Sequence, residues 1–133
     1  MQTFLPLPNY LESMRCLDRV RLGNQIWLEG VILLKGGWKH HPASKMWRGH
    51  EYHLGLYLLD GCKILEERGK AYPEVIKRIE AEMIKFPNTG SPSWLGDEKF
   101  HASHRSNLLR KNPEWFSQFG WTEPADLPYV WPV

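Results

Sequence analysis

Hydrophobic residues recur every three or four positions in three stretches of the chain, the spacing typical of helices with one apolar face. The first stretch begins near Asp18 and reaches the glycine pair 36–37, where a helix is expected to end. The second covers residues 50–68, and the third begins at Pro73 and stops before Pro87. These patterns predict three amphipathic helices.

Capping residues and prolines predict the shorter helices. Asn9 is a suitable cap for a short helix ending near residue 14, and Pro42 is expected to begin another helix. Asp97 is a suitable cap for a helix over residues 98–110, and Asn112-Pro113 predicts one more short helix after it. No stretch alternates between apolar and polar residues with a period of two, so strands are not expected.

The length of 133 residues suits one hydrophobic core, and 42% hydrophobic and 24% charged residues are close to globular averages. This composition argues against a disordered, collagen-like or fibrous chain. We therefore predict an all-α fold: a compact single-domain helical bundle over residues 1–133. It has an extended N-terminal lead (residues 1–8) and a C-terminal tail rich in proline and tryptophan (residues 121–133).

Charge and cysteine content identify no partner by themselves. The 17 Lys and Arg residues exceed the 15 Asp and Glu residues by a formal charge of only +2. Cys16 and Cys62 lie outside any CxxC motif, so we expect two buried thiols in a reducing compartment. The N-terminus lacks a signal-peptide pattern and no apolar stretch is long enough to cross a bilayer, which predicts a cytoplasmic protein with no membrane partner.

The segment of residues 38–53, WKHHPASKMWRGHEYH, combines basic, histidine and aromatic side chains. Nucleic-acid surfaces use cations for the phosphates and aromatic rings for stacking on bases. We therefore predict nucleic-acid contacts from Lys39, His40, His41, Lys45, Trp47 and Arg48, with Trp38 as a further stacking residue. The alternative is a loop whose tryptophans anchor the core and whose cations are merely solvated.

The helix expected at residues 98–110 carries a second polar group. His101, Arg105 and Leu108 share one helical stripe, and His104 lies beside them. Together with Asn107 and neighbouring serines, these side chains offer many donors to anionic oxygens, which predicts phosphate binding. The alternative is an ordinary polar surface face of an amphipathic helix.

Two HxxH pairs, His50/His53 and His101/His104, raise the question of a metal ion. Zinc sites generally add cysteine or carboxylate ligands at recognisable spacing, and no HExxH motif occurs here. We predict no metal and no cofactor, and retain a metal-dependent nuclease as an alternative. A GxSxG elbow, a GxGxxG loop and a Walker sequence are also absent, which disfavours serine hydrolysis and dinucleotide or triphosphate chemistry through those folds.

The first long helix contains a candidate catalytic group and three candidate nucleic-acid contacts, Arg19, Arg21 and Gln25. Glu29, one turn past Gln25, is suited to act as a general base or to stabilise a cationic transition state. Arg19 and Arg21 stand at the helix start, where the helix dipole disfavours cations and where a bound anion, including DNA phosphate, would account for them. A solvent-facing Glu29 and simply solvated arginines are the alternatives.

The order of these parts resembles the pyrimidine-dimer DNA glycosylase family, the phage endonuclease V type. The likeness rests on the extended lead, the first long helix, the HHP loop, the second long helix ending in CKILEERG, and the terminal PEWFSQFGW run. It implies an all-α protein that flips a nucleotide out of damaged duplex DNA, attacks the sugar with the N-terminal amine, and relies on a glutamate of the first long helix. By position, that glutamate is Glu29 and the amine belongs to residue 1 or 2, with Met1 as the candidate here.

The chain departs from the family pattern at two positions. Its start, Met1-Gln2-Thr3, places a bulky Gln2 where it hinders removal of the initiator methionine, and Leu28 rather than an arginine precedes Glu29. Attack by the Met1 amine, attack by water with Glu29 as base, and DNA binding alone therefore remain open. The preferred hypothesis is a base-excision protein for a damaged or modified base in duplex DNA. A non-enzymatic helical module that binds nucleic acid or protein through its tail is the alternative from another class.

Overall fold

Helices make up all the regular secondary structure within residues 2–133, the part of the chain described by the computed structural model, which leaves out the side chains of Leu28 and Glu29. The predicted all-α fold class is therefore confirmed. No helix within these residues is long and apolar enough to span a bilayer.

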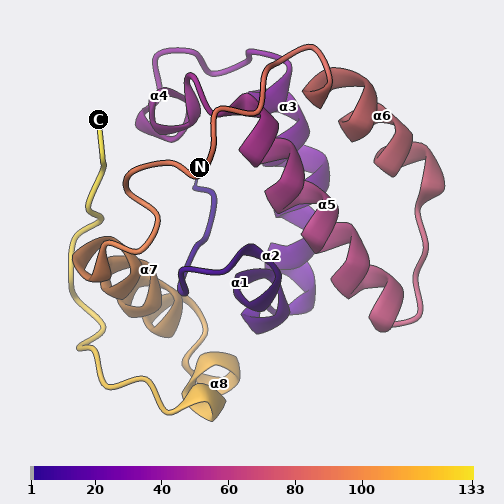
Figure 1. Ribbon diagram of the computed structural model, residues 1–133. Helices are drawn as coiled ribbons and strands as arrows, with labels where there is room; N and C mark the ends of the chain where they lie inside the picture. The colour runs from indigo at the N-terminus through magenta and orange to yellow at the C-terminus, as the bar shows by residue number, and fades with distance from the viewer. Residues whose placement is uncertain (1) are drawn as a thin grey trace.

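The first half of the chain forms a group of helices around one long central helix (Figure 1). They are α1 Tyr10–Cys16, α2 Arg19–Asn24, the π-helix η1 Gln25–Gly30, α3 Val31–Leu34, α4 Pro42–Trp47 and α5 Glu51–Glu67. The second half contributes α6 Pro73–Met83, α7 Glu98–Lys111, α8 Pro113–Phe116 and the 3-10 turn η2 Ser117–Phe119. The order of elements thus follows the order predicted from the apolar pattern.

Local side-chain bonds explain where several helices begin. The Asn9 side chain accepts a hydrogen bond from the Glu12 amide at 2.9 Å, and Asn112 accepts from the Trp115 amide at 3.2 Å. Asp97 caps α7 in the same way through the Lys99 amide. These bonds satisfy amide groups that the first turn of a helix leaves unpaired, so the predicted caps are confirmed.

The first long helix is continuous but not uniformly α-helical. It passes from α2 through the π-helical segment η1 into α3, and a π-helix takes more residues per turn than an α-helix. Gly30, the last residue of η1, packs directly against the central helix α5. A Cβ built at Gly30 would lie 2.0 Å from Leu58 Cδ2. Only glycine fits this contact with α5 without displacing it, and the apolar spacing alone did not predict the wider turn.

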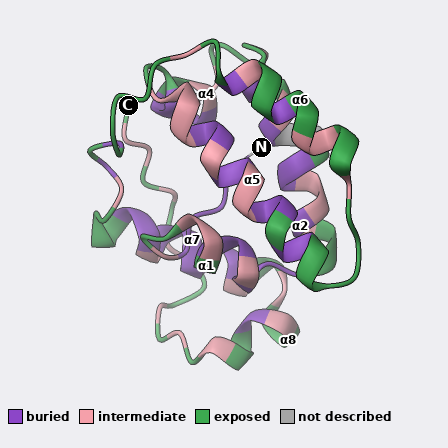
Figure 2. Cartoon of the chain, turned by 45° about the vertical axis from the view of Figure 1, so that its right-hand side comes forward, coloured by how far each residue is buried: buried purple, intermediate pink, exposed green. Residues whose placement is uncertain are grey.

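Helix α5 lies at the centre of the bundle, with α1 on one side and α6 on the other (Figure 1). Two of its glycines allow close approach: a Cβ at Gly61 would lie 2.9 Å from Met14 Cε, and one at Gly55 would lie 2.6 Å from Met83 Cβ. Helix α6 buries one stripe and exposes the rest of its surface (Figure 2). The core is therefore built on α5.

The lead is extended, as predicted, and its residues 2–6 are buried rather than free. They run between α7 on one side and the group of η1, α4 and α5 on the other (Figure 1). The tail follows α7, where the Leu127 amide donates to Ser106 Oγ at 3.0 Å and the Val130 amide donates to Ser103 Oγ at 3.2 Å. Two extended segments from opposite ends of the sequence therefore both bind to α7.

Candidate functional site

Gln25 fixes the position of the lead beside the first long helix. Its Oε1 accepts a hydrogen bond from the Phe4 amide at 2.8 Å, and its Nε2 donates to the Gln2 carbonyl at 2.9 Å. The side chain is only 1% exposed. The Gln25 amide therefore binds the main chain of the lead, and its contact with DNA stays a prediction.

Trp47 and Tyr57 hold the next part of the lead. The Trp47 indole N–H donates to Thr3 Oγ1 at 3.0 Å, and the Tyr57 hydroxyl lies 2.7 Å from the Phe4 carbonyl oxygen. Trp47 is 1% exposed and packs edge to face with Trp94. Trp47 therefore anchors the core, as the alternative interpretation expected, and its stacking on a base stays a prediction.

His101 and His104 bind both polar groups of one lead residue. His104 Nδ1 accepts from the Leu5 amide at 2.8 Å, and His101 Nδ1 lies 2.7 Å from the Leu5 carbonyl oxygen. His101 Nε2 accepts from the Gly96 amide at 2.9 Å, so its ring hydrogen is on Nδ1 and donates to Leu5. His104 carries its hydrogen on Nε2, which has no hydrogen-bond partner among the described residues.

Both imidazoles are neutral because they are buried. Burial lowers the pKa of His104 to about 3, with a smaller contribution from nearby His101. Burial also lowers the pKa of His101, against the opposing effect of its hydrogen bond to Leu5. Neutral, fully buried imidazoles provide no positive charge for phosphate. In this structure His101 and His104 hold the lead, and their contact with DNA stays a prediction.

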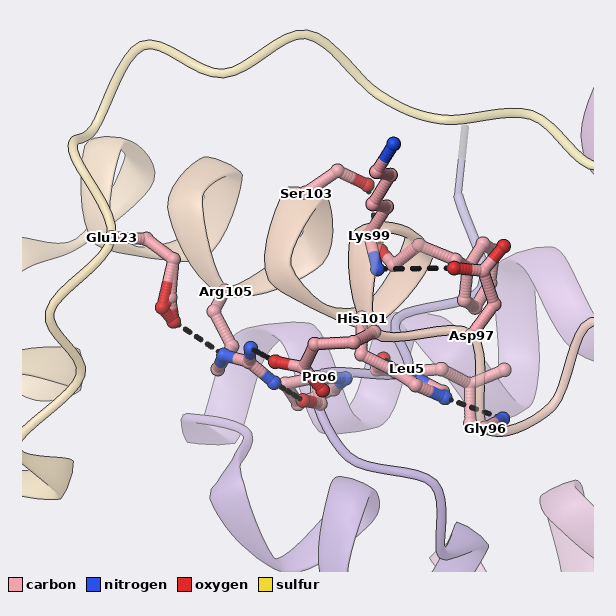
Figure 3. Close-up of polar contacts among 11 residues, drawn as sticks. Leu5, Pro6, Gly96, Asp97, Lys99, His101, Ser103, Arg105 and Glu123 are labelled. Carbon is pink, nitrogen blue, oxygen red and sulfur yellow. Dashed lines mark hydrogen bonds and ion pairs between the residues drawn. The ribbon is translucent and has the colours of Figure 1, made fainter.

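Arg105 joins the lead, α7 and the tail. Its Nη1 donates to the Pro6 carbonyl at 2.8 Å, and its other nitrogens pair with Glu123 of the tail and Glu98 of α7 (Figure 3). Asn107 Nδ2 donates at 3.0 Å to a tail carbonyl, that of Leu127.

Arg105 and Asn107 therefore bind the two extended segments in this structure, and the phosphate-binding face expected on α7 stays a prediction. Neither segment has a partner strand, so their main-chain groups are satisfied by polar side chains of α7 instead. The signal in the sequence was the pairing of a polar helix with extended, proline-rich segments at both ends of the chain.

The two buried histidines predict a loss of stability in mild acid. Because the folded pKa of each lies below its unfolded value, their contribution is complete above about pH 6.5 and is lost as the pH falls below it. From His104 alone, we expect the free energy of unfolding to fall by about 2 kcal/mol between pH 7 and pH 5. Urea unfolding at several pH values measures this slope.

The matched variants for this slope are His104→Asn and, on the exposed loop, His40→Asn. His104→Asn is expected to be less stable at pH 7 and to show a shallower dependence on pH, whereas His40→Asn keeps the wild-type slope. Equal slopes in all three proteins would contradict the assignment of a neutral His104.

The HxxH pairs do not assemble a metal centre in the described part of the chain. His101 and His104 are held by Leu5, and His53 Nδ1 lies 3.0 Å from the Tyr10 hydroxyl. Among residues with described side chains, no three His, Cys, Asp or Glu groups lie close enough to share an ion. The geometry therefore gives no support to the alternative of a metal-dependent nuclease.

The two thiols are unsuited to nucleophilic attack. Cys16 and Cys62 are both buried and free, as expected. Burial raises the pKa of each thiol to about 11, so both are protonated at neutral pH.

A hollow of about 290 Å³ opens where the lead begins. We call it the N-terminal hollow. Gln2, Arg21 and Gln25 line it, together with Lys111 from the end of α7 and Tyr129 from the tail. Arg21 also pairs with Asp18 at 3.0 Å, which orients its guanidinium group. Sequence reasoning found Arg21 but missed Lys111 and Tyr129, because they reach the hollow only through the packing of α7 and the tail.

The loop cations predicted to contact DNA lie on the outside. Lys39, His40, Lys45 and Arg48 are exposed, and Arg48 Nη2 donates to the Lys39 carbonyl at 2.6 Å. His41 differs, because its Nδ1 caps α4 by accepting from the Ala43 amide and its ring contacts Trp131 of the tail. The segment of residues 38–53 thus contains exposed cations, an exposed tryptophan, Trp38, and a buried one, Trp47.

A family model described as pyrimidine dimer DNA glycosylase matches residues 1–77 of the chain, more than half of its length. The chain belongs to the pyrimidine dimer DNA glycosylase family. Membership gives it a DNA glycosylase-like function in DNA repair, with DNA as the substrate class. No curated protein and no solved structure matches the chain.

The range matched by the glycosylase family contains the lead, the first long helix and the exposed loop cations, whereas α7 and the tail lie beyond it. Met1 and the Glu29 side chain, the predicted catalytic groups, lie outside the described residues. The backbone of Glu29 belongs to η1, about one turn past Gln25 in the same segment. The helix that carries this glutamate is therefore the helix that holds the lead.

Proposed function

We propose that the protein excises a damaged or modified base from duplex DNA at the N-terminal hollow. The observation that carries the proposal is the anchoring of residues 2–6 by buried side chains of η1, α4, α5 and α7. These bonds hold the described lead residues beside the hollow, which Arg21 and Lys111 also line. A family whose reaction begins at the N-terminal amine needs such a fixed lead, because orientation of the reacting groups lowers the barrier.

The proposed reaction uses the amine of Met1 and the carboxylate of Glu29. The amine nitrogen adds to the sugar carbon C1′ as the bond to the base breaks, and the base leaves with the bonding electrons and takes up a proton. Loss of the nitrogen proton and opening of the sugar ring give a Schiff base between protein and DNA. Glu29 would assist as the general acid–base group, and Arg21 and Lys111 would bind phosphates beside the reacting sugar.

The exposed cations of the loop are proposed to follow the DNA backbone. Lys39→Gln and Lys45→Gln are each expected to lower the slope of log K against log salt by about 0.9, because each lost phosphate contact releases one fewer counterion. Titration of a fluorescent duplex at several salt concentrations measures the slope. Lys77→Gln, which removes an exposed charge from α6, is the control and should leave the slope unchanged. Identical slopes in the wild type and all three variants would mean that the DNA backbone does not contact this loop.

The decisive experiment is incubation with duplexes that carry a cyclobutane pyrimidine dimer, uracil or another modified pyrimidine, with borohydride added. Borohydride reduces a Schiff base to a stable amine, so the expected result is a covalent protein–DNA adduct that peptide mapping assigns to Met1. Base release without an adduct would overturn the amine step in favour of water as nucleophile. Neither adduct nor base release from any duplex would overturn the excision proposal.

The runner-up function is a binding module that uses its tail. The hydrogen bonds from the tail to Ser103, Ser106 and Asn107 favour a structural role for this segment instead. Deletion of residues 121–133 tests this directly: a destabilised remainder supports the structural role, whereas a stable remainder that has lost a partner would favour the module.

A further inference from the structure

A second and larger opening lies on the other flank of α2. This groove has a volume of about 730 Å³ and runs between α2, the end of α5 and α8. It shares Val20 and Asn24 with the N-terminal hollow, so the two openings meet along α2. Its size falls within the range of small-molecule sites, about 300–1,000 Å³. The excision reaction proposed above does not use it.

Three aromatic side chains line this α2 groove. Trp27 is 38% exposed, and its ring meets that of Tyr72 edge to face, with 4.5 Å between the centroids. Trp115 is held in place because its indole N–H donates to the Cys16 carbonyl at 2.7 Å. An exposed indole on a π-helical turn and a second indole fixed by a hydrogen bond provide surfaces on which a planar ring can stack.

The polar lining of the groove is cationic over the part of the chain whose side chains are described. Arg19, Arg68 and Lys70 line it there, and no described Asp or Glu does. Among residues with described side chains, none of these three cations has an ion pair with a carboxylate. Arg68 is oriented by donating to the carbonyls of Arg15 and Leu17, and its guanidinium carbon lies over the ring of Trp115, 5.9 Å from the ring centroid. The groove therefore combines cationic side chains with aromatic walls.

We propose that the α2 groove binds one nucleotide, with the base against Trp27 or Trp115 and the phosphate among Arg19, Arg68 and Lys70. A nucleotide is the common ligand that joins a planar aromatic ring to an anion over the length of such a groove. Guanidinium and ammonium groups bind phosphate, and every base can stack on an indole ring. The same chemistry is available from a free nucleotide and from a nucleotide turned out of a DNA strand that also reaches the N-terminal hollow.

Calorimetric titration of the full chain with deoxyadenosine monophosphate tests the proposal. The matched probes are deoxyadenosine, which lacks the phosphate, and deoxyribose 5-phosphate, which lacks the base. The nucleotide should bind at least about 10-fold more tightly than either, because each matched probe lacks one of the two contacts. Inorganic phosphate binding as tightly as the nucleotide would overturn the proposal, since the aromatic walls would then contribute nothing.

Variants locate the binding to this groove. Trp27→Ala is expected to weaken nucleotide binding about 10-fold and Lys70→Gln about 5-fold, in line with a lost stacking and a lost phosphate contact. Ile84→Ala and Lys63→Gln, which remove an exposed apolar side chain and an exposed charge elsewhere, are the controls. If Trp27→Ala does not fold, Lys70→Gln still tests the proposal, because Lys70 lies on the surface and its replacement removes no core contact. Unchanged affinity in Lys70→Gln and in folded Trp27→Ala would overturn the proposal.

Titration with a short undamaged single-stranded oligonucleotide distinguishes a free nucleotide from a nucleotide of a DNA strand as the natural ligand. Binding of the free nucleotide indicates a free ligand, whereas binding of the oligonucleotide alone, with the same loss in Trp27→Ala, indicates a nucleotide of a strand. Binding of neither overturns the proposal. None of these measurements requires a damaged base or turnover, so a protein that releases no base still gives a clear answer about the groove.

Discussion

Glu29→Gln is expected to slow base release at least about 100-fold in single-turnover assays while leaving the affinity for duplex DNA unchanged. General acid–base catalysis contributes about 10²–10⁴-fold to such reactions, and glutamine keeps the shape of glutamate but does not exchange a proton. The expectation rests on the position of Glu29 in η1, the segment whose Gln25 holds the main chain of the lead.

The control for this experiment is Glu74→Gln, which removes an exposed carboxylate from α6. It should release base at the wild-type rate. Equal rates in the Glu29→Gln protein would show that Glu29 takes no part in the reaction, and weaker DNA binding without slower release would assign it to binding instead.

Arg105→Ala is expected to lower the free energy of unfolding by about 3–5 kcal/mol. Removing one partner from a buried charge pair leaves the other charge uncompensated, and here Glu123 and the Pro6 carbonyl lose their donor together. Urea unfolding at neutral pH measures the loss. Lys99→Ala, on the exposed side of the same helix, should change stability by less than about 0.5 kcal/mol.

Arg105 also separates two interpretations of α7. If its guanidinium group bound DNA, the Arg105→Ala protein would keep its stability and show a smaller salt dependence of DNA binding. The bonds to the lead and the tail predict the reverse: a large loss of stability, with an unchanged salt slope in whatever fraction remains folded.

The helices were predictable because their signals are local. Apolar spacing located α5 and α6, and the side chains of Asn9, Asp97 and Asn112 cap helices where the sequence indicated. The π-helical turn was not predictable, since it depends on the contact between Gly30 and Leu58 of another helix. The spacing of apolar residues in one helix gives little indication of a feature that depends on its contact with another helix.

The burial of the polar side chains of α7 could not be predicted from the helix alone, for a physical reason. A helix stripe with His101 and Arg105 has the pattern of a solvated face when only its own residues are considered. It is buried because the lead and the tail bring unpaired main-chain groups to it, and polar side chains are the partners that such groups require. Trp47 is a second example, since this tryptophan among basic residues is buried where a lead residue, Thr3, offers it an acceptor.

The candidate site was predictable only in part. Arg21 and Gln25 were found because they lie with Glu29 on one helix, although the sequence did not indicate that Gln25 also holds the lead. Lys111 and Tyr129 were missed, because nothing in the sequence near the lead indicates that the end of α7 and the tail complete the hollow.

The anchoring of the lead also sets the order in which its contacts can form during synthesis. Leu5 is made before its partners His101 and His104, which follow it by 96 and 99 residues. Contacts between such distant parts of a chain form late, because a long loop must close first. The helices of the first half are therefore synthesised before the lead has its partners, and residues 2–6 have all their buried hydrogen bonds only after α7 has been made.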